Sequence, residues 1–278
     1  MSARTERRPR KLTPAQVEQY RTEGYLIGLP AIPAAQAAEC CARFAAADTS
    51  RLAALDHPWH AQAHLLFTWA DRIVRHSTIL DTMEDLLGPD LMVESADLFV
   101  KEPGSESFVS MHQDSYYWDI EPAGIATAWV ALSEATPENG CMRFAARTHH
   151  GSKLPHAESS AAYNMLSRGQ TMTLPEGTSL VEAALAPGQM SIHHCLLAHG
   201  SGPNRTDCRR LGLAIRYVPP YVRVASGPPM AATLVRGEDR YGHFAPAPPR
   251  PKHDMDAAAI AAQRQALEPH AASNYATS

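Results

Sequence analysis

One short segment of this sequence brings together two side chains that can bind a metal. In Met111-His112-Gln113-Asp114, an imidazole and a carboxylate stand two residues apart. Residues 107–118 predict a strand, and side chains two apart on a strand point to the same face of a sheet. A second histidine from another strand would complete a two-histidine, one-carboxylate triad. Such a triad leaves three positions of an octahedral Fe(II) open for a cosubstrate and dioxygen.

The candidate third ligand is His199. It follows a predicted strand that starts at residue 189 and heads the segment His199-Gly200-Ser201-Gly202-Pro203-Asn204, whose glycines turn the chain toward the next strand. His193 and His194 are alternative ligands. As neighbours on a strand they face opposite ways, so one of them points inward, where we expect it to support the ligands or to pack in the core.

Arg210 opens the next predicted strand, residues 210–218. A guanidinium is suited to bidentate capture of a carboxylate, so an open-faced iron beside a buried arginine fits 2-oxoglutarate. Arg209 is the alternative, but alternation lets only one of the two face the interior. Arg216 lies six residues after Arg210, so on a strand it faces the same way. It is a candidate anion contact for the substrate or a member of a structural ion pair.

These segments resemble the phytanoyl-CoA dioxygenase family of Fe(II)- and 2-oxoglutarate-dependent oxygenases over residues 20–217. His112-Gln113-Asp114 alone would be a weak signal, because a strand can carry such a pair on its surface by chance. The order of five segments makes the resemblance specific. Besides the His-Gln-Asp segment, they are Trp129 within Thr-Ala-Trp-Val-Ala-Leu, residues 138–143 (Glu-Asn-Gly-Cys-Met-Arg), His199-Gly-Ser-Gly-Pro-Asn, and Arg210.

The resemblance implies a mainly β fold with flanking helices, built on a double-stranded β-helix, a jelly-roll, cupin-like barrel. It implies Fe(II), 2-oxoglutarate and O2 as cofactors, with ascorbate as the in vitro reductant. Halogenases of the family lack the ligand carboxylate, so Asp114 favours a hydroxylase with succinate and CO2 as coproducts. The site residues that the resemblance implies are His112, Asp114 and His199 for iron, Arg210 and Ser201 for the distal carboxylate, and Lys101 and Trp129 for the cosubstrate pocket.

Candidate substrate contacts come from three regions. Residues 116–118 follow the metal strand and form a pocket wall or an aromatic core patch. Residues 148–175 make a long polar loop, typical of a lid. Residues 234–244 fold over the mouth of the barrel or pack on its outside. Arginines facing the cavity would favour an anionic substrate, and an apolar lining would favour a terpenoid or an acyl group. The candidates are Tyr116, Tyr117, Trp118, Met165, Arg168, Arg216 and Arg236.

The elements that must position these residues follow from periodicity and turn residues. Residues 1–12 predict a flexible basic arm and residues 13–278 a single oxygenase domain. Within that domain we expect a helical prefix over 13–90, a jelly-roll core over 91–220 and a C-terminal extension over 221–278. Thr13 precedes Pro14 and caps the first helix, which includes Tyr20 and Tyr25. A short alanine-rich helix is predicted over 256–267.

Composition excludes several classes of protein. The chain has 278 residues, 45% hydrophobic, so it can bury a large core. A net charge of −4 argues against nucleic-acid binding through phosphate neutralisation. No apolar run approaches the roughly 18 residues of a membrane helix, and the first twelve residues lack the apolar core of a signal peptide. Five cysteines without a framework spacing favour a reducing cytoplasm.

The leading hypothesis is hydroxylation of an unactivated C–H bond in a small organic metabolite, in specialised metabolism or in the catabolism of an uncommon compound. The same oxidative chemistry could instead give desaturation, cyclisation or epimerisation. A hypothesis of another class is a catalytically silent, cupin-like barrel that binds a metal or a small ligand. Succinate formation and product mass discriminate among the three.

Overall fold

The computed structural model describes residues 10–47, 49–117, 120–159, 161–166, 170–225 and 229–274. Most of the predicted arm, together with Trp118 and Arg168, lies outside these residues. The helices are α1 Pro14–Glu23, α2 Ala34–Ala45, α3 Thr49–Ala53, α4 Ala63–Leu66, α5 Thr68–Val74, α6 Ser77–Leu87 and α7 Ala257–Asn274, with short 3₁₀ helices η1 Asp114–Tyr117 and η2 Thr148–His150. The strands are β1 Tyr25–Pro30, β2 Leu91–Lys101, β3 Val109–His112, β4 Ile120–Glu121, β5 Ala126–Ala131, β6 Met142–Ala145, β7 His156–Ala157, β8 Thr171–Met172, β9 Leu180–Ala183, β10 Gln189–His194, β11 His199–Ser201, β12 Arg210–Val218, β13 Arg223–Val224, β14 Ala231–Arg236 and β15 Ala245–Pro246.

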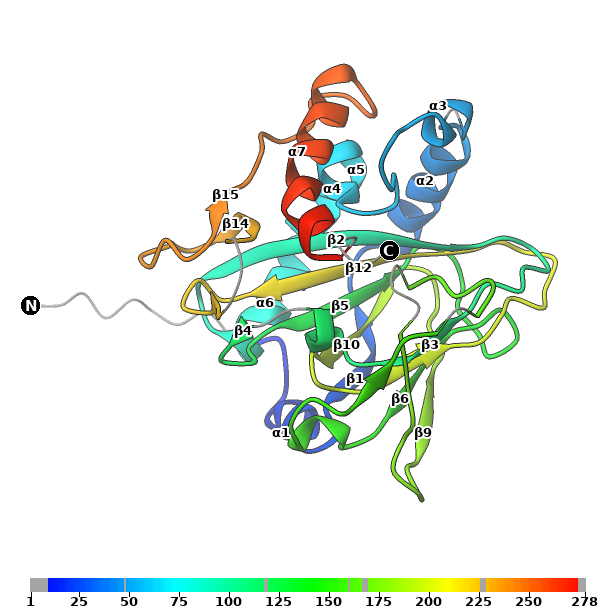
Figure 1. Cartoon of the computed structure of the whole chain (residues 1–278), viewed down its shortest axis with the longest axis vertical. Helices are drawn as coiled ribbons and strands as arrows, with labels where there is room; N and C mark the ends of the chain where they lie inside the picture. Colours follow the sequence, from blue (N-terminus) through cyan, green and yellow to red (C-terminus); the bar gives the residue numbers. More distant parts are fainter. Residues whose placement is uncertain are drawn as a thin grey trace, which may run out of the picture.

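Two sheets form the core of the molecule (Figure 1). The larger has the order β1-β10-β5-β12-β2-β14-β15 and the smaller the order β3-β11-β6-β9. Their inner faces pack together, because Trp129 and Ala214 of the large sheet share a hydrophobic cluster with Met142 and Phe144 of the small one. Among the described residues the two sheets share no strand, so they form the two walls of a jelly roll. The predicted mainly β jelly roll with flanking helices is confirmed.

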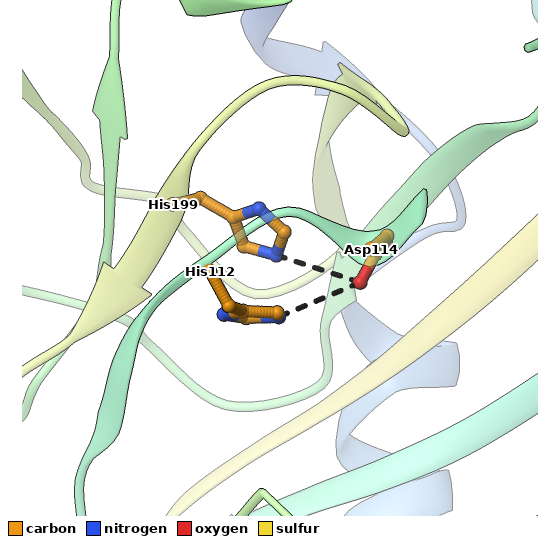
Figure 2. A group of neighbouring side chains, drawn as sticks. All are labelled: His112, Asp114 and His199. Atoms are coloured by element: carbon orange, nitrogen blue, oxygen red, sulfur yellow. Dashed lines mark ion pairs between the residues drawn. The ribbon is translucent and has the colours of Figure 1, made fainter. Parts of the chain in front are cut away.

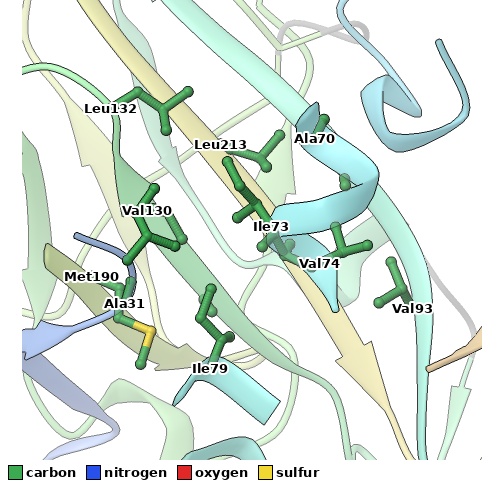
Figure 3. Close-up of a cluster of buried hydrophobic side chains, with 14 of the residues drawn as sticks. Ala31, Ala70, Ile73, Val74, Ile79, Val93, Val130, Leu132, Met190 and Leu213 are labelled. Carbon is green, nitrogen blue, oxygen red and sulfur yellow. The ribbon is translucent and has the colours of Figure 1, made fainter. Parts of the chain in front are cut away.

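Helices cover the outer face of the large sheet. Alternation along β12 explains why: Leu211, Leu213 and Ile215 join the cluster under the helices, whereas Ala214 belongs to the cluster between the sheets. Figure 3 shows Ile73 lying beside Leu213 in that outer cluster. A buried aliphatic side chain of this kind contributes about 1.5–3 kcal/mol. The helical layer therefore holds the large sheet in place and leaves its inner face for the site.

The N-terminal helix begins as predicted and ends earlier. The Thr13 side chain accepts a hydrogen bond from the Gln16 backbone in a capping box. The helix stops at Gly24, which adopts a left-handed φ of 87°. The prediction that Tyr25 belongs to this helix is wrong, because Tyr25 starts β1 and pairs with His193 of β10.

The predicted strand over residues 107–118 is shorter in the structure. β3 ends at His112, and Asp114 begins the 3₁₀ helix η1. The Gln113 side chain holds this bend, since its Nε2 donates to the Leu196 carbonyl and its Oε1 accepts from the Leu154 backbone N–H. A bend after His112, rather than strand alternation, therefore brings Asp114 to the same side as the imidazole.

The C-terminal extension follows the second of the two predicted courses and packs on the outside. Residues 231–236 form β14 at the edge of the large sheet, paired with β2. Arg236 forms ion pairs with Asp81 and Glu84 of α6 instead of covering the barrel mouth. The alanine-rich helix α7 is longer than predicted and packs beside α4 (Figure 1). In the described residues, none of the helices has the length and apolar character needed to cross a membrane.

Candidate active site

The two candidate metal-binding histidines are cross-strand partners. His199 at the start of β11 pairs directly with His112 at the end of β3. Their rings lie 4.2 Å apart, between centroids. Antiparallel pairing brings side chains on one face within about 5 Å of each other, so the register of β3 and β11 alone juxtaposes two residues that are far apart in sequence.

Asp114 completes the group (Figure 2). Its Oδ1 lies 3.5 Å from Nε2 of His112 and 3.8 Å from Nε2 of His199. All three residues are buried, and their ligand atoms lie within 4.8 Å of one another. The cluster therefore offers two nitrogens and one oxygen to a single ion.

Backbone carbonyls set the tautomers of both histidines. Nδ1 of His112 lies 3.0 Å from the Ser110 carbonyl, and Nδ1 of His199 lies 2.9 Å from the Leu197 carbonyl. A carbonyl can only accept, so each Nδ1 carries the proton and each Nε2 presents its lone pair to the cluster. Burial, followed by the neighbouring His112, lowers the pKa of His199 well below its usual range, which keeps its ring neutral.

The second oxygen of Asp114 is held by the protein. Its Oδ2 accepts a hydrogen bond of 2.8 Å from Thr127 Oγ1 and lies 3.8 Å from Nε of Arg216. Burial by itself raises the pKa of this carboxyl, but Arg216 and the neighbouring His112 and His193 hold the pKa well below its usual range. Asp114 is therefore a carboxylate whose Oδ1 is left for a ligand.

His193 is the inward-facing member of the histidine pair on β10. It is 1% exposed and pairs with Thr127 of β5, and its Nε2 lies 3.4 Å from Asp114 Oδ2. Its Nδ1 has no hydrogen-bond partner among the described residues. His194 faces the other way, toward Tyr20 of α1. The expectation that the inward histidine lies behind the ligands agrees with this geometry.

Arg210 and Ser201 line a small chamber next to the three residues, and Lys101 is buried beside Ser201. Arg210 is 1% exposed, and its guanidinium lies 5.2 Å from the Trp129 ring and donates to the Gly140 carbonyl. Its cross-strand partner Lys101 is also fully buried and donates a 2.6 Å hydrogen bond to Ser201 Oγ. The structure thus brings together all four residues predicted for the cosubstrate pocket.

Burial affects the charge state of both cations. Burial, followed by the nearby Arg210 charge, lowers the pKa of Lys101 to about 6, and burial lowers the pKa of Arg210 to about 10. Within the part of the chain that the structure describes, neither cation forms an ion pair with a carboxylate, and Nε of Arg210 has no hydrogen-bond partner. Buried cations in such surroundings are suited to an anionic ligand.

The residues present fit an iron ion and a dicarboxylate. Two imidazoles and a carboxylate match the donor set of a facial triad, and the unsatisfied Nε of Arg210 points to an anion in the adjoining chamber. Arg209, the alternative to Arg210, faces outward and pairs with Glu102. Alternation along β12 thus separates the two arginines as expected.

The predicted substrate contacts fall into three groups. Met165 and Arg216 line a cavity of about 950 Å³ that also reaches His112 and Asp114. Tyr116 stacks on His156 and does not line this cavity, and Arg236 lies at α6. Trp118, Arg168 and the side chain of Tyr117 lie outside the described residues.

Arg216 is an ion-paired residue, which was the second of the two predicted roles. It pairs with Asp97 of β2 and approaches Asp114. Asp97 was not predicted, although alternation along β2 places it on the same face as Lys101. The other unpredicted lining residues of the cavity come from β2, from residues 55–62 and from α7.

Comparison with known proteins gives a consistent picture. A probable phytanoyl-CoA dioxygenase of Caenorhabditis elegans is 31% identical over 156 residues, which cover 51% of this chain and 48% of the relative. The chain thus spans about half the length of the curated relatives it matches. Its fold is similar to that of the non-heme monooxygenase ThoJ, with a TM-score of 0.77, 35% identity, and coverage of 94% of this chain and 98% of ThoJ. It is also similar to the non-heme, alpha-ketoglutarate-dependent epimerase SnoN, with a TM-score of 0.59, 25% identity, and coverage of 77% and 87%.

The family-level comparison covers most of the chain. The model of the family described as phytanoyl-CoA dioxygenase (PhyH) matches residues 8–212, which include the His112–Asp114–His199 cluster and both buried cations. The resemblance found in the sequence motifs is therefore confirmed over a continuous region that contains the helical prefix, the small sheet and the strands of the large sheet up to the start of β12. On this match, the chain belongs to the phytanoyl-CoA dioxygenase family.

Proposed function

We propose that this protein is an Fe(II)- and 2-oxoglutarate-dependent dioxygenase that hydroxylates an unactivated C–H bond of a small organic metabolite. The observation that carries the proposal is the convergence of two imidazole Nε2 atoms and one carboxylate oxygen beside a chamber lined by the buried Arg210. His112, Asp114 and His199 hold the iron in this proposal. Arg210, with Ser201 and Lys101, receives the distal carboxylate of 2-oxoglutarate, and Trp129 forms a wall of its pocket.

Iron with 2-oxoglutarate and O2, when bound, supplies a reaction in which one oxygen atom enters the substrate C–H bond and the other enters succinate, with release of CO2. The protein's own residues perform the positioning. Thr127 and Arg216 fix the orientation of Asp114, and the carbonyls of Ser110 and Leu197 fix the two imidazole tautomers. The three ligand side chains are buried, which limits the access of bulk water to their ligand atoms.

A related outcome is the second candidate function. The likeness to the epimerase SnoN, at 25% identity, supports a reaction in which this site removes a hydrogen atom from the substrate and transfers no oxygen to the product. Desaturation and cyclisation belong to the same alternative. The mass of the product separates them, since hydroxylation adds one oxygen, desaturation removes two hydrogens and epimerisation leaves the mass unchanged.

We further propose that residues 13–278 form one oxygenase domain, because β14 and α7 of the C-terminal extension pack on β2 and α4. A cytoplasmic location is proposed as well. It is supported by five free cysteines, of which Cys208 is exposed.

The test is succinate release with Fe(II), 2-oxoglutarate and ascorbate, screened over a panel of metabolites. The Asp114→Ala variant should lose substrate-dependent succinate release and keep its fold, whereas Asp207→Ala, an exposed carboxylate, should behave like the wild type. Full turnover by Asp114→Ala would remove this residue from the ligand set. Absence of succinate with every metabolite would favour a catalytically silent, ligand-binding barrel.

A further inference from the structure

The large cavity joins the metal ligands to a wall built from α7 and from residues 55–62, which we call the wall segment. It has a volume of about 950 Å³, and His112 and Asp114 line it together with Trp59 and His60 of the wall segment. A cavity of this size holds a drug-sized molecule. A side chain of the wall segment can therefore contact a substrate whose reacting carbon lies beside the metal ligands.

Neighbouring elements hold three consecutive backbone carbonyls of the wall segment. The buried Gln263 side chain of α7 donates from Nε2 to the carbonyls of Trp59 and Ala61, at 3.0 Å and 2.5 Å. Between them, the carbonyl of His60 accepts a 2.8 Å hydrogen bond from the backbone N–H of Leu98 on β2. This short stretch of backbone is therefore fixed between a helix and a strand.

Further contacts keep α7 in this position. The Oε1 atom of Gln263 lies 3.0 Å from Nε2 of His57, and Arg264 donates a 2.8 Å hydrogen bond to Asp56. Both partners belong to the wall segment. The C-terminal extension, which lies beyond the region matched by the family model, therefore shapes the space for the substrate in this chain.

The wall segment ends in a strained residue. Gln62 adopts a left-handed φ of 52°, which costs a residue other than glycine about 1–3 kcal/mol. Its backbone N–H donates to Asp97 at 3.0 Å, and its side chain donates to the Glu94 carbonyl at 3.1 Å. The other oxygen of Asp97 pairs with Arg216, which approaches Asp114. Contacts with β2 thus impose the conformation of the wall segment and connect it to the metal ligands.

The His60 side chain projects from this fixed backbone without a hydrogen bond. It is exposed and lines the cavity, and among the described residues neither of its ring nitrogens has a hydrogen-bond partner. The ring makes an edge contact with Trp59, at 5.6 Å between centroids and 90° between planes. A backbone fixed on both sides presents this imidazole to the cavity in one position, which is the arrangement of a preorganised binding group.

The ring of His60 is neutral near pH 7. Desolvation by the surrounding protein lowers its pKa, and the nearby Asp97 carboxylate, which raises the pKa, does not reverse the shift. A neutral imidazole offers one N–H donor and one lone pair. It suits an uncharged oxygen group, a hydroxyl or a carbonyl, which accepts a hydrogen bond from the N–H.

We propose that His60 orients the substrate by donating a hydrogen bond to a hydroxyl or carbonyl oxygen on it, while an apolar part of the substrate lies on Trp59 and Leu267. Gln263 is a positioning residue in this proposal, because it fixes the backbone on both sides of His60. The proposal rests on the proposed function, since it places the substrate between His60 and the metal ligands.

Two probes of similar size test this contact without turnover. The protein, loaded with Fe(II) and 2-oxoglutarate under anaerobic conditions, is equilibrated by dialysis with 1-naphthylmethanol or with 1-ethylnaphthalene, in which a methyl group replaces the hydroxyl. His60→Leu should weaken binding of the alcohol about two- to tenfold, the effect of one hydrogen bond, and should not weaken binding of the hydrocarbon. Equal changes for the two probes, or no change for either, would overturn the proposal.

Matched variants separate a direct contact from a structural role. His60→Gln keeps an N–H donor and should restore part of the binding of the alcohol. His253→Leu, at an exposed histidine outside the cavity lining, should bind both probes like the wild type. An alcohol affinity that is as low in His60→Gln as in His60→Leu would contradict a hydrogen bond from this position.

The role of Gln263 is tested through His60. Gln263→Leu should lower the ratio of alcohol affinity to hydrocarbon affinity, because it releases the backbone around His60, and it should lower this ratio no further in a protein that already carries His60→Leu. Gln265→Leu, at an exposed position of α7, is the control and should keep the wild-type ratio. Additive effects of Gln263→Leu and His60→Leu would overturn the positioning role.

Succinate release, measured separately, distinguishes this proposal from the proposed function. Release of succinate by a protein in which His60→Leu affects neither probe overturns the role of His60 and leaves the oxygenase proposal intact. Selective loss of alcohol binding in a protein that forms no succinate with any metabolite overturns the oxygenase proposal, while His60 keeps its binding role. With an accepted metabolite, His60→Leu should raise the amount of succinate formed per oxidised product, and an unchanged ratio would overturn orientation by His60.

Discussion

Nε2 of His193 lies 3.4 Å from the Oδ2 atom of Asp114, whereas His112 and His199 approach Oδ1 of the same carboxylate. The two oxygens of Asp114 therefore have different surroundings. Oδ1 faces the two imidazoles, and Oδ2 is held by Thr127 and faces His193 and Arg216. Such outer contacts orient a ligand before the metal arrives.

The first prediction concerns this contact. His193→Phe should weaken binding of Fe(II) or Co(II) about 10- to 100-fold, because it removes a group that orients Asp114. The free energy of unfolding of the metal-free protein should not fall, since the change removes a buried imidazole whose Nδ1 has no partner among the described residues. Metal titration and urea unfolding measure the two quantities. His193→Gln keeps a donor and should restore part of the affinity; a loss of stability without a loss of metal affinity would make His193 a packing residue only.

The second prediction tests the cation assigned to the cosubstrate. Arg210→Ala should raise the KM for 2-oxoglutarate roughly 10²- to 10⁴-fold, because a desolvated carboxylate without its partner costs about 3–5 kcal/mol. Arg209→Ala, at the residue just before β12, is the matched control, since its guanidinium pairs with Glu102. Steady-state kinetics over a range of 2-oxoglutarate concentrations gives the KM of each variant. An unchanged KM in Arg210→Ala would point to Lys101 as the main anchor.

The third prediction uses the lowered pKa of Lys101. The folded protein holds this group at a pKa of about 6, below the ordinary value near 10.5, so the unfolded chain binds more protons between those values. Stability contributed by this site therefore rises with pH, by about 1.4 kcal/mol for each pH unit. Lys101→Met removes that dependence. The difference in free energy of unfolding in favour of Lys101→Met over the wild type should therefore be largest near pH 6 and shrink toward pH 9.

Urea unfolding of the metal-free protein at several pH values measures this change. The exposed Lys252→Met is the control and should run parallel to the wild type. Parallel pH profiles for Lys101→Met and the wild type would mean that Lys101 stays charged in the folded protein.

The fourth prediction concerns the chamber wall. A Cβ atom at Gly212 would lie 2.0 Å from the Trp129 ring, so Gly212→Ala forces the indole out of its place beside Arg210. Overpacking of this kind costs about 1–3 kcal/mol of stability, and the affinity for 2-oxoglutarate should fall as well. Gly151→Ala, with open space around its Cβ, should match the wild type. Thermal unfolding and equilibrium binding of 2-oxoglutarate test the two effects, and normal values for both would show that the indole can move freely.

Several features of the site follow from local rules and were predictable. The parity of β12 separates Arg210 from Arg209, and the capping box at Thr13 places the first helix. Both depend on residues close together in the chain. The early end of the first helix and the bend after His112 were missed. The first depends on a left-handed glycine, and the second depends on Gln113 bonding to residues 154 and 196.

The sequence by itself determined the donor types and which residues of a strand share a face, because alternation along a strand is a property of the backbone. The jelly roll was implied by the resemblance of the sequence motifs to the family. Tertiary structure decided which histidines meet, that Arg216 is paired with Asp97, and that α7 forms one wall of the substrate cavity. These outcomes depend on contacts between distant segments. Alternation does not determine which face of a strand points toward the site. The packing of the sheets and helices determines this.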